Sequence, residues 1–220
     1  MFIEIPDLLS AGQLNRLQEI AAKAKFVDGR ISNPNNKAKN NLQLDHTDSS
    51  YQESAKLMGD ALVQNETVQN FTFISGLAPP LMCLYQPGMA YGKHSDNAFI
   101  NVGQAVLRSD ISSTIFLAEP DSYEGGELAI DLGSKTVNVK GAAGSAVLYP
   151  STTLHEVLPV TSGERLVAIT FIQSQIMDEQ KRDLLYTLNE VAALEGYNIS
   201  WENRVLLQHV SAGLHRMWST

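Results

Sequence analysis

Cysteine is nearly absent from this chain. Cys83 is the only one among 220 residues, which excludes a disulfide within the chain. Its neighbours Leu81, Met82 and Leu84 are apolar and predict a buried, unreactive thiol rather than a reactive one. A chain that needs no disulfide suits a reducing compartment, so a cytoplasmic location is expected.

Long hydrophobic runs are also absent. The longest, such as Leu166–Ile172, have the length of a strand and are far too short to cross a membrane. The first residues, Met1–Pro6, lack the basic and apolar regions of a signal peptide. Basic residues are outnumbered, because 16 Lys and Arg against 24 Asp and Glu give a net charge of −8. Nucleic-acid grooves need clustered Lys and Arg, so neither a nucleic-acid nor a membrane partner is expected.

What the chain does have is 44% hydrophobic residues, enough for one substantial core with helical additions. Residues 1–70 are expected to form helices and loops packed on that core. Ser10 and Gln13 can form a capping box for an amphipathic helix that reaches Lys25, and a second helix is expected over Tyr51–Gln64. Between them, Gly29–Asn41 predicts a polar loop or a pair of short exposed strands.

The central part, residues 71–175, alternates short β-rich runs with glycine- and serine-rich turn signals. Strands are expected at Phe71–Ser75, Leu81–Tyr85, Ala90–His94, Ser113–Ala118, Gly126–Asp131, Thr136–Val139, Ser145–Tyr149, His155–Val157 and Leu166–Ile172. Many short strands without intervening helices favour a sandwich or jelly roll over an alternating β–α fold. The fold class expected is therefore α+β, mostly β in its core and with helices at both ends.

Residues 176–220 return to helical periodicity. One apolar stripe runs from Leu184 to Ala192, and Ser200 can cap a second helix. This tail is expected to pack on the β core or on another subunit.

The residues that carry chemistry gather in the central part. His94 and Asp96 are two residues apart, so on a strand their side chains leave the same face. His155 follows Asp96 after 59 residues, and Arg165 comes ten residues later. Two histidines and one carboxylate on one face of a metal, with other positions open, are the ligand set of non-haem Fe(II) oxygenases. The guanidinium of Arg165 can bind a carboxylate of a dicarboxylate co-substrate through two parallel hydrogen bonds. Hairpin pairing is expected to bring Arg165 near His155.

A longer pattern carries a family resemblance. It contains Tyr85-x-x-Gly88-x-x-Tyr91-x-x-His94-x-Asp96, Gly125-Gly126-Glu127-Leu128, Gly144-Ser-Ala-Val-Leu-Tyr149-Pro, His155 and Gly163-Glu-Arg165. From Leu81 to Phe171 the chain resembles the prolyl 4-hydroxylase superfamily, and more narrowly its bacterial PKHD-type hydroxylases. The helical tail is similar to that of the PKHD type as well.

The resemblance implies a double-stranded β-helix (jelly roll) and an Fe(II)- and 2-oxoglutarate-dependent dioxygenase that releases succinate and CO₂. It implies that His94, Asp96 and His155 are the iron ligands and catalytic residues, and that Arg165 binds the distal carboxylate of 2-oxoglutarate. It also implies L-ascorbate as the reductant that restores the iron after uncoupled turnover. The substrate that it implies is peptidyl or a small molecule, with O₂ as the oxidant.

Two further residues are candidates for the 2-oxoglutarate pocket. Tyr85 is expected to hydrogen-bond the co-substrate, as the equivalent tyrosine does in related prolyl hydroxylases, and its alternative is a strand aromatic in the core. Thr114 is a weaker candidate, and Tyr91 is expected to pack rather than to contact the co-substrate.

Each ligand assignment also has a structural alternative. Asp96 could instead be a surface turn residue, and His155 a hydrogen-bonded histidine of the core. Arg165 could instead be the cation of a surface ion pair. The remaining histidines, His46, His209 and His215, are expected to be structural or exposed.

Several other functions fit parts of this sequence pattern. An iron halogenase on the same barrel lacks the carboxylate that Asp96 supplies, and a nucleic-acid dealkylase is disfavoured by the acidic charge. A zinc hydrolase leaves Arg165 unexplained. The main alternative is a non-catalytic, cupin-like metal-binding or sensing protein. The loops expected to select the substrate are Gly29–Asp45 and Asn97–Asp110, and their sequences do not identify it. The sequence is compatible with a homo-oligomer and does not give the oligomeric state.

Overall fold

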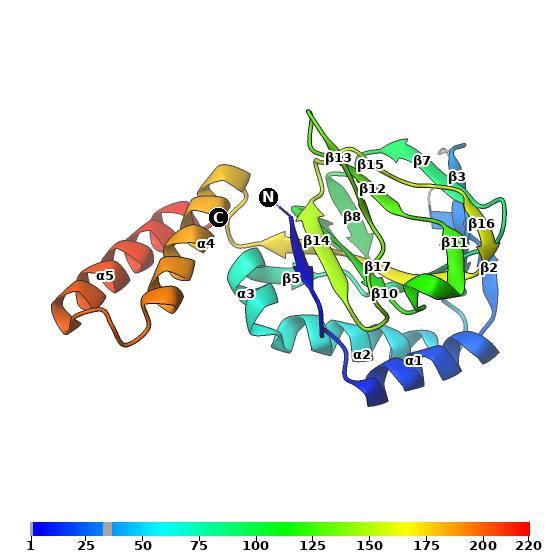
Figure 1. The fold of residues 1–220 in the computed structure, drawn as a ribbon, viewed down its shortest axis with the longest axis horizontal. Coiled ribbons are helices and arrows are strands. Elements are labelled where there is room, and N and C mark those ends of the chain that lie inside the picture. The colour runs from blue at the N-terminus through cyan, green and yellow to red at the C-terminus, as the bar shows by residue number, and fades with distance from the viewer. Residues whose placement is uncertain (1, 33–36) are drawn as a thin grey trace.

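The computed structural model describes residues 2–32 and 37–220, and its centre is a pair of antiparallel sheets that face each other (Figure 1). The larger sheet has eight strands, ordered β1 (Ile3–Ile5), β14 (Ala146–Pro150), β10 (Ile111–Phe116), β17 (Arg165–Ser174), β6 (Leu81–Tyr85), β4 (Leu42–Leu44) and β2 (Phe26–Asp28), with β5 (Ile74–Leu77) also paired to β17. The smaller sheet is ordered β13 (Thr136–Val139), β12 (Leu128–Asp131), β15 (His155–Val157), β7 (Ala90–His94) and β3 (Lys39–Asn40). This architecture is the jelly roll expected from the sequence.

Two short ribbons and the helices complete the fold. The ribbons pair β11 (Tyr123–Gly125) with β16 (Val160–Gly163), and β8 (Phe99–Val102) with β9 (Ala105–Arg108). The helices are α1 (Ala11–Lys23), α2 (Tyr51–Gln64), α3 (Glu66–Thr72), α4 (Glu179–Glu195) and α5 (Trp201–Trp218), with 3₁₀ turns η1 (Gly29–Ser32) and η2 (Pro120–Ser122).

The helix starts follow the predicted caps. At α1 the Ser10 hydroxyl accepts from the Gln13 amide at 3.3 Å, and the Gln13 side chain accepts from the Ser10 amide at 2.9 Å. Ser200 likewise accepts from the Asn203 amide at the start of α5. These side chains satisfy amides that the first turn leaves without helical partners, so the capping box and the Ser200 cap are confirmed.

The strand expected at Phe71–Ser75 was wrong in its first half. Asn65 caps a short helix by accepting from the Val68 amide at 3.0 Å, and α3 runs on to Thr72. Phe73 then adopts φ +47° and ends the helix, and β5 begins at Ile74. The local cap therefore outweighs the β propensity of Phe71, Thr72 and Phe73.

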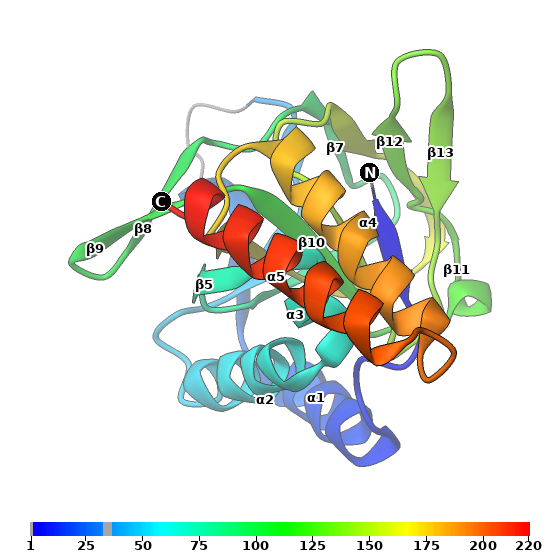
Figure 2. The ribbon, with the colours of Figure 1, turned by 90° about the vertical axis from the view of Figure 1, so that its left-hand side faces the viewer.

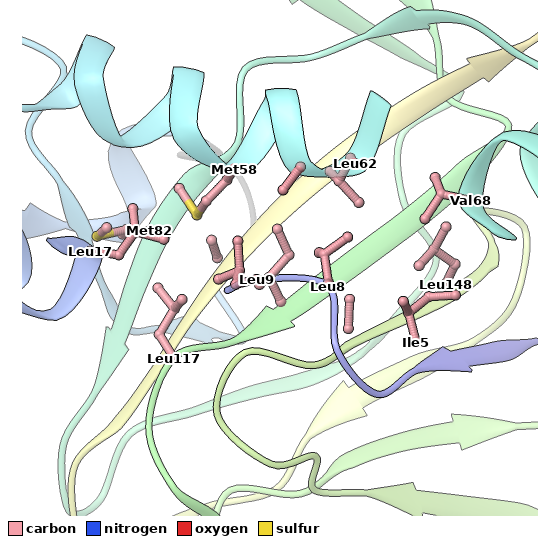
Figure 3. Packing of buried hydrophobic residues seen from close by; sticks show 14 of the residues in the cluster. Ile5, Leu8, Leu9, Leu17, Met58, Leu62, Val68, Met82, Leu117 and Leu148 are labelled. Carbon is pink, nitrogen blue, oxygen red and sulfur yellow. The ribbon is translucent and has the colours of Figure 1, made fainter. Parts of the chain in front are cut away.

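Two hydrophobic clusters hold the sheets. α1 and α2 cover the outer face of the larger sheet, where Leu17, Met58, Leu62, Met82 and Leu148 pack together (Figures 1 and 3). A second cluster fills the space between the two sheets and includes Cys83. Cys83 is buried, as expected, and burial raises the pKa of its thiol. The larger sheet, which carries Tyr85, Thr114 and Arg165, is thus backed by a packed helical layer.

The stretches expected to be loops contain ordered structure. The Asn97–Asp110 segment forms the β8–β9 hairpin, which turns at Gly103 with φ +60°. In the Gly29–Asn41 stretch, η1 and β3 are described, and Lys39 and Asn41 are buried rather than exposed. The expectation of short exposed strands there holds in part: β3 pairs with β7 along the smaller sheet and buries Lys39, whereas Asn40 is exposed, and residues 33–36 lie outside the described residues.

The tail forms an antiparallel helical hairpin, α4 with α5, that lies beside the β core in Figure 1 and faces the viewer in Figure 2. A small cluster of Phe73, Ile176 and Leu185 joins it to the rest of the molecule. Among the described residues, no helix combines the length and apolar character needed to cross a bilayer.

Candidate functional site

Two paired strands of the smaller sheet bring the two histidines together. His94 ends β7 and His155 begins β15, and the two residues are direct partners in the register of this pair. Asp96 follows two residues after His94, and its Oδ1 lies 3.7 Å from His94 Nε2 while its Oδ2 lies 3.8 Å from His155 Nε2. The three potential ligand atoms all lie within 4.8 Å of one another. His46, His209 and His215 do not join this group.

Hydrogen bonds at the other ring nitrogens orient both imidazoles. His94 Nδ1 lies 2.8 Å from the Gly92 carbonyl, and His155 Nδ1 lies 3.0 Å from the Thr153 carbonyl. A carbonyl only accepts, so each Nδ1 carries the proton and each Nε2 presents a lone pair to the centre of the group. Burial, and then the nearby His155, lower the pKa of His94, which favours the neutral imidazole.

A chain of buried serines holds the carboxylate between the histidines. Ser112 donates to Asp96 Oδ2 at 2.5 Å, its hydroxyl lies 2.7 Å from that of Ser151, and Ser109 donates to Ser151 at 2.9 Å. Because the Ser112 hydroxyl donates its proton to Asp96, Ser151 is the donor in the hydrogen bond between Ser151 and Ser112. The three hydroxyls therefore point in one direction, toward Asp96, and fix the carboxylate before any ligand arrives.

Arg165 lies in the same pocket as these residues, on the opposite sheet. It opens β17 opposite Tyr85 of β6, and its guanidinium carbon lies 5.0 Å from the Tyr85 ring centroid. The expected hairpin between His155 and Arg165 was wrong. β16 intervenes between their strands and pairs with β11, so Arg165 meets His155 across the interior of the barrel.

The charge of Arg165 is not balanced within the chain. The side chain is 1% exposed, and in residues 2–32 and 37–220 no carboxylate forms an ion pair with it. Its Nε is buried without a hydrogen-bond acceptor. Burying an unpaired charge is costly, so this pocket fits an anionic group from outside the chain.

Tyrosines surround the guanidinium. Tyr85, Tyr123 and Tyr149 are buried, and burial raises the pKa of each hydroxyl, so all three are neutral hydrogen-bonding groups at neutral pH. Tyr149 also packs edge-on against His155, with ring centroids 5.0 Å apart, and its hydroxyl is bonded to Thr114. Tyr91 stacks on His94 at 3.8 Å, as a packing residue is expected to do.

The donor set fits Fe(II) and a dicarboxylate. Two imidazole nitrogens and one carboxylate oxygen form the three-ligand facial set of non-haem iron, and the unbalanced Arg165 lines the same pocket. Among the lining residues that sequence reasoning missed are Lys39, Asn41, Ser112 and Tyr149. Only Tyr149 had a signal, because it stands in the Gly144–Pro150 motif, whereas the other three are placed by pairing between distant segments.

Comparison with known proteins places the chain in a family. A family model described as the 2OG-Fe(II) oxygenase superfamily matches residues 81–173. A PKHD-type hydroxylase from Sphingopyxis alaskensis is 50% identical over 215 residues, covering 98% of each chain. Another from Shewanella sp. (strain MR-4) is 38% identical and covers 100% of this chain and 99% of its own. The chain belongs to the PKHD-type hydroxylases.

Solved structures share the fold of this PKHD-type hydroxylase. A prolyl-4-hydroxylase from Pseudomonas putida superposes with a TM-score of 0.55 at 19% identity, covering 79% of this chain and 92% of its own. A prolyl hydroxylase from Trichoplax adhaerens, solved with a hypoxia inducible factor peptide fragment, superposes with a TM-score of 0.60 at 18% identity. The match covers 83% of this chain and 86% of that one. The PKHD-type hydroxylase is thus an oxidoreductase that uses Fe(II), 2-oxoglutarate and O₂ on a substrate not yet identified.

Proposed function

We propose that His94, Asp96 and His155 are the iron ligands of this hydroxylase and that Arg165 binds the distal carboxylate of 2-oxoglutarate. The observation that carries this proposal is the buried guanidinium without an anionic partner, in the same pocket as a two-histidine, one-carboxylate group. A structural arginine in a core is normally paired with a carboxylate, which is not the case here.

Each residue has a defined task in this proposal. When bound, iron and 2-oxoglutarate supply the oxidation that hydroxylates a substrate C–H bond while 2-oxoglutarate becomes succinate and CO₂. His94 and His155 offer Nε2 lone pairs, and Asp96 offers a carboxylate oxygen held by Ser112. Arg165 offers two parallel N–H donors to one carboxylate from a side chain that is almost fully buried.

Tyr85 and Thr114 are proposed as the remaining 2-oxoglutarate contacts. The Tyr85 ring faces the guanidinium of Arg165, and Thr114 lines the same pocket with its hydroxyl bonded to Tyr149. Both side chains therefore lie in the pocket proposed for 2-oxoglutarate, Tyr85 beside the guanidinium. Their replacement by Phe and Val would remove one hydroxyl each and leave the ring and the branched shape in place.

Three finer proposals accompany this assignment. L-Ascorbate is proposed as the reductant after uncoupled turnover, the cytoplasm as the location, and a homo-oligomer as the assembly. Nucleic acid is not proposed as a substrate, because the net charge is −8.

The test uses the protein under anaerobic conditions. Fe(II) and 2-oxoglutarate together should produce a metal-to-ligand charge-transfer absorbance with one iron per chain, and admitting O₂ should release succinate. A protein that binds one Fe(II) but neither binds 2-oxoglutarate nor releases succinate would instead be a non-catalytic metal-binding jelly roll.

A further inference from the structure

A second buried cation stands at the mouth of the proposed iron site. Lys39 is 4% exposed and lies on β3, paired with Tyr91 of β7, whose ring stacks on His94. Its Nζ lies 5.7 Å from the Tyr91 ring centroid and donates to the Ser32 hydroxyl at 2.7 Å. The remaining ammonium protons form no ion pair with a carboxylate in the part of the chain that the structure describes.

Lys39 lines two adjoining cavities. One is the inner pocket that holds His94, Asp96, His155 and Arg165, and the other is a wider groove that opens outward from it. The outer groove runs past His46 and the β8–β9 hairpin and shares His94 and Asp96 with the inner pocket. A substrate that reaches the iron through this groove therefore passes Lys39.

The acidic groups near Lys39 are already engaged. Asp28, whose field reaches Lys39, is bound by the Arg30 guanidinium, and Asp96 is bound by Ser112 and faces the two histidines. Asp96 alone among the Asp and Glu of residues 2–32 and 37–220 lines these two cavities. The ammonium is thus a buried charge without a counter-charge, the same condition that marks Arg165.

With Fe(II) and 2-oxoglutarate bound at the proposed site, the formal charges in the pocket do not cancel. Fe(II), Arg165 and Lys39 are cationic, and Asp96 and the 2-oxoglutarate dianion are anionic. Fe(II) carries a double positive charge, so these groups leave the pocket with one uncompensated positive charge. Arg165 is matched by the distal carboxylate of 2-oxoglutarate, which leaves Lys39 to attract the substrate.

We propose that Lys39 is a substrate-binding residue that pairs with a carboxylate of the substrate, next to the carbon that is hydroxylated. This inference rests on the proposed function and deepens it by giving the substrate class: an anionic carboxylate compound or a carboxylate-bearing residue, not a neutral one. The charge-assisted bond from a buried ammonium makes the neutral amide of the same compound a poor substitute.

The test measures binding to the protein loaded with Zn(II) and saturating 2-oxoglutarate, so that Arg165 and the metal positions are occupied and no turnover occurs. The probes are a pool of N-acetyl-L-amino acids as free carboxylates and a matched pool as primary amides, followed by saturation-transfer NMR and calorimetry. Wild type should bind the carboxylates at least about tenfold more tightly than the amides, equivalent to about 1.4 kcal/mol. Lys39→Met should lose this preference, and Lys39→Arg, which keeps a positive charge, should retain it in part.

Lys37→Met is the matched control, because Lys37 is an exposed lysine two residues away and should keep the wild-type preference. Equal binding of the two pools by wild type, including no binding of either, overturns the inference, and so does a preference that survives Lys39→Met. Succinate release by wild type without any probe tests the proposed function separately. A protein that turns over 2-oxoglutarate but shows no carboxylate preference refutes the role of Lys39 alone.

Discussion

The two oxygens of Asp96 have different surroundings. Oδ2 accepts the Ser112 proton at 2.5 Å, whereas Oδ1 has no such donor and faces His94 Nε2 at 3.7 Å. A hydrogen bond to one oxygen reduces its availability to a metal, so the geometry favours binding through the other oxygen only. Binding through one oxygen leaves more of the metal open for 2-oxoglutarate and O₂. Ser112 is therefore a positioning residue for Asp96.

Replacing Ser112 tests this role directly. Ser112→Ala should weaken metal binding by roughly ten- to a hundredfold, the usual cost of losing a partner of a metal ligand. Co(II) titration, followed by its visible absorbance, measures the affinity. Ser113→Ala is the matched control, since the neighbouring Ser113 hydroxyl is buried without a hydrogen-bond partner in the described structure and should change little. Equal effects of the two variants would contradict a special role for Ser112.

The histidines allow the simplest prediction at this scale. His94→Ala or His155→Ala should abolish stoichiometric Fe(II) binding, because two protein ligands then remain where the proposed set needs three. Circular dichroism should be unchanged, since the β7–β15 pairing is made by the backbone. His209→Ala, on the exposed face of α5, should bind iron like wild type. Stoichiometric iron in both site variants would remove these residues from the ligand set.

Arg165 predicts opposite effects on binding and on stability. Arg165→Met should weaken 2-oxoglutarate binding by roughly ten- to a hundredfold, because charge-assisted hydrogen bonds are worth about 1.5–3 kcal/mol. Without ligand the same variant should be as stable as wild type or more so, since an unpaired buried charge is replaced by an apolar side chain. Titration of 2-oxoglutarate into the Fe(II) protein and urea unfolding of the apoprotein measure the two effects. Marked destabilisation with unchanged affinity would make Arg165 a structural residue.

At residue level, the sequence brought out pairs in which chemistry and local spacing coincide. His94 and Asp96 were recognisable because they are two residues apart, although β7 ends at His94 and Asp96 follows the strand. Lys39 and Ser112 were not, because lysine and serine are common and their neighbours come from β7 and from Ser151, far away in the sequence. Their roles follow from pairing between distant segments, which one sequence does not encode in a local pattern.

At the scale of elements, alternation and turn residues located several strands to the residue. β6, β7, β13 and β15 have the predicted bounds, because each is a short β-rich run closed by turn signals. The β8–β9 hairpin escaped prediction because its strands are largely exposed, and Leu107 is the one residue of the two strands that is buried. A strand that buries little is specified by its turn and its pairing more than by its own composition.

Gly126 connects element geometry to the site. It has φ +69°, and a Cβ there would lie 2.9 Å from Val160 Cγ2 and 3.0 Å from Arg165 Cδ. Gly126→Ala should cost roughly 1–3 kcal/mol from backbone strain, and should weaken 2-oxoglutarate binding by displacing Arg165. Urea unfolding and 2-oxoglutarate titration test both parts. Gly12→Ala in α1, where a Cβ meets nothing within 4 Å, should be neutral or stabilising by up to about 1 kcal/mol. Wild-type behaviour of Gly126→Ala would show that β11 and β17 adjust freely there.

At the scale of the whole molecule, we propose three parts: residues 1–70 as a helical layer, 71–175 as the oxygenase core, and 176–220 as a helical extension. The first two share one large cluster, in which Leu17 of α1 and Met58 of α2 pack against Met82 of β6. The extension is attached differently. α5 has no buried residue, α4 buries only Arg182 and Leu185, and Arg182 donates to the Ile176 carbonyl at 2.8 Å. The first two parts should therefore unfold together, and the third should open separately.

Hydrogen exchange tests this division. Local stability follows the number of buried contacts, so amides of α5 should open through a small local transition and those of β17, buried in the centre of the larger sheet, only through global unfolding. Exchange in α5 should then be at least about a hundredfold faster than in β17, because each tenfold corresponds to about 1.4 kcal/mol of opening free energy. Mass spectrometry of peptides from both elements, at low micromolar protein, gives the comparison. α5 as slow as β17 at that concentration would show that the helix is covered by another surface. A rate in α5 that falls as protein concentration rises would assign that cover to a second copy of the chain, because only association depends on concentration.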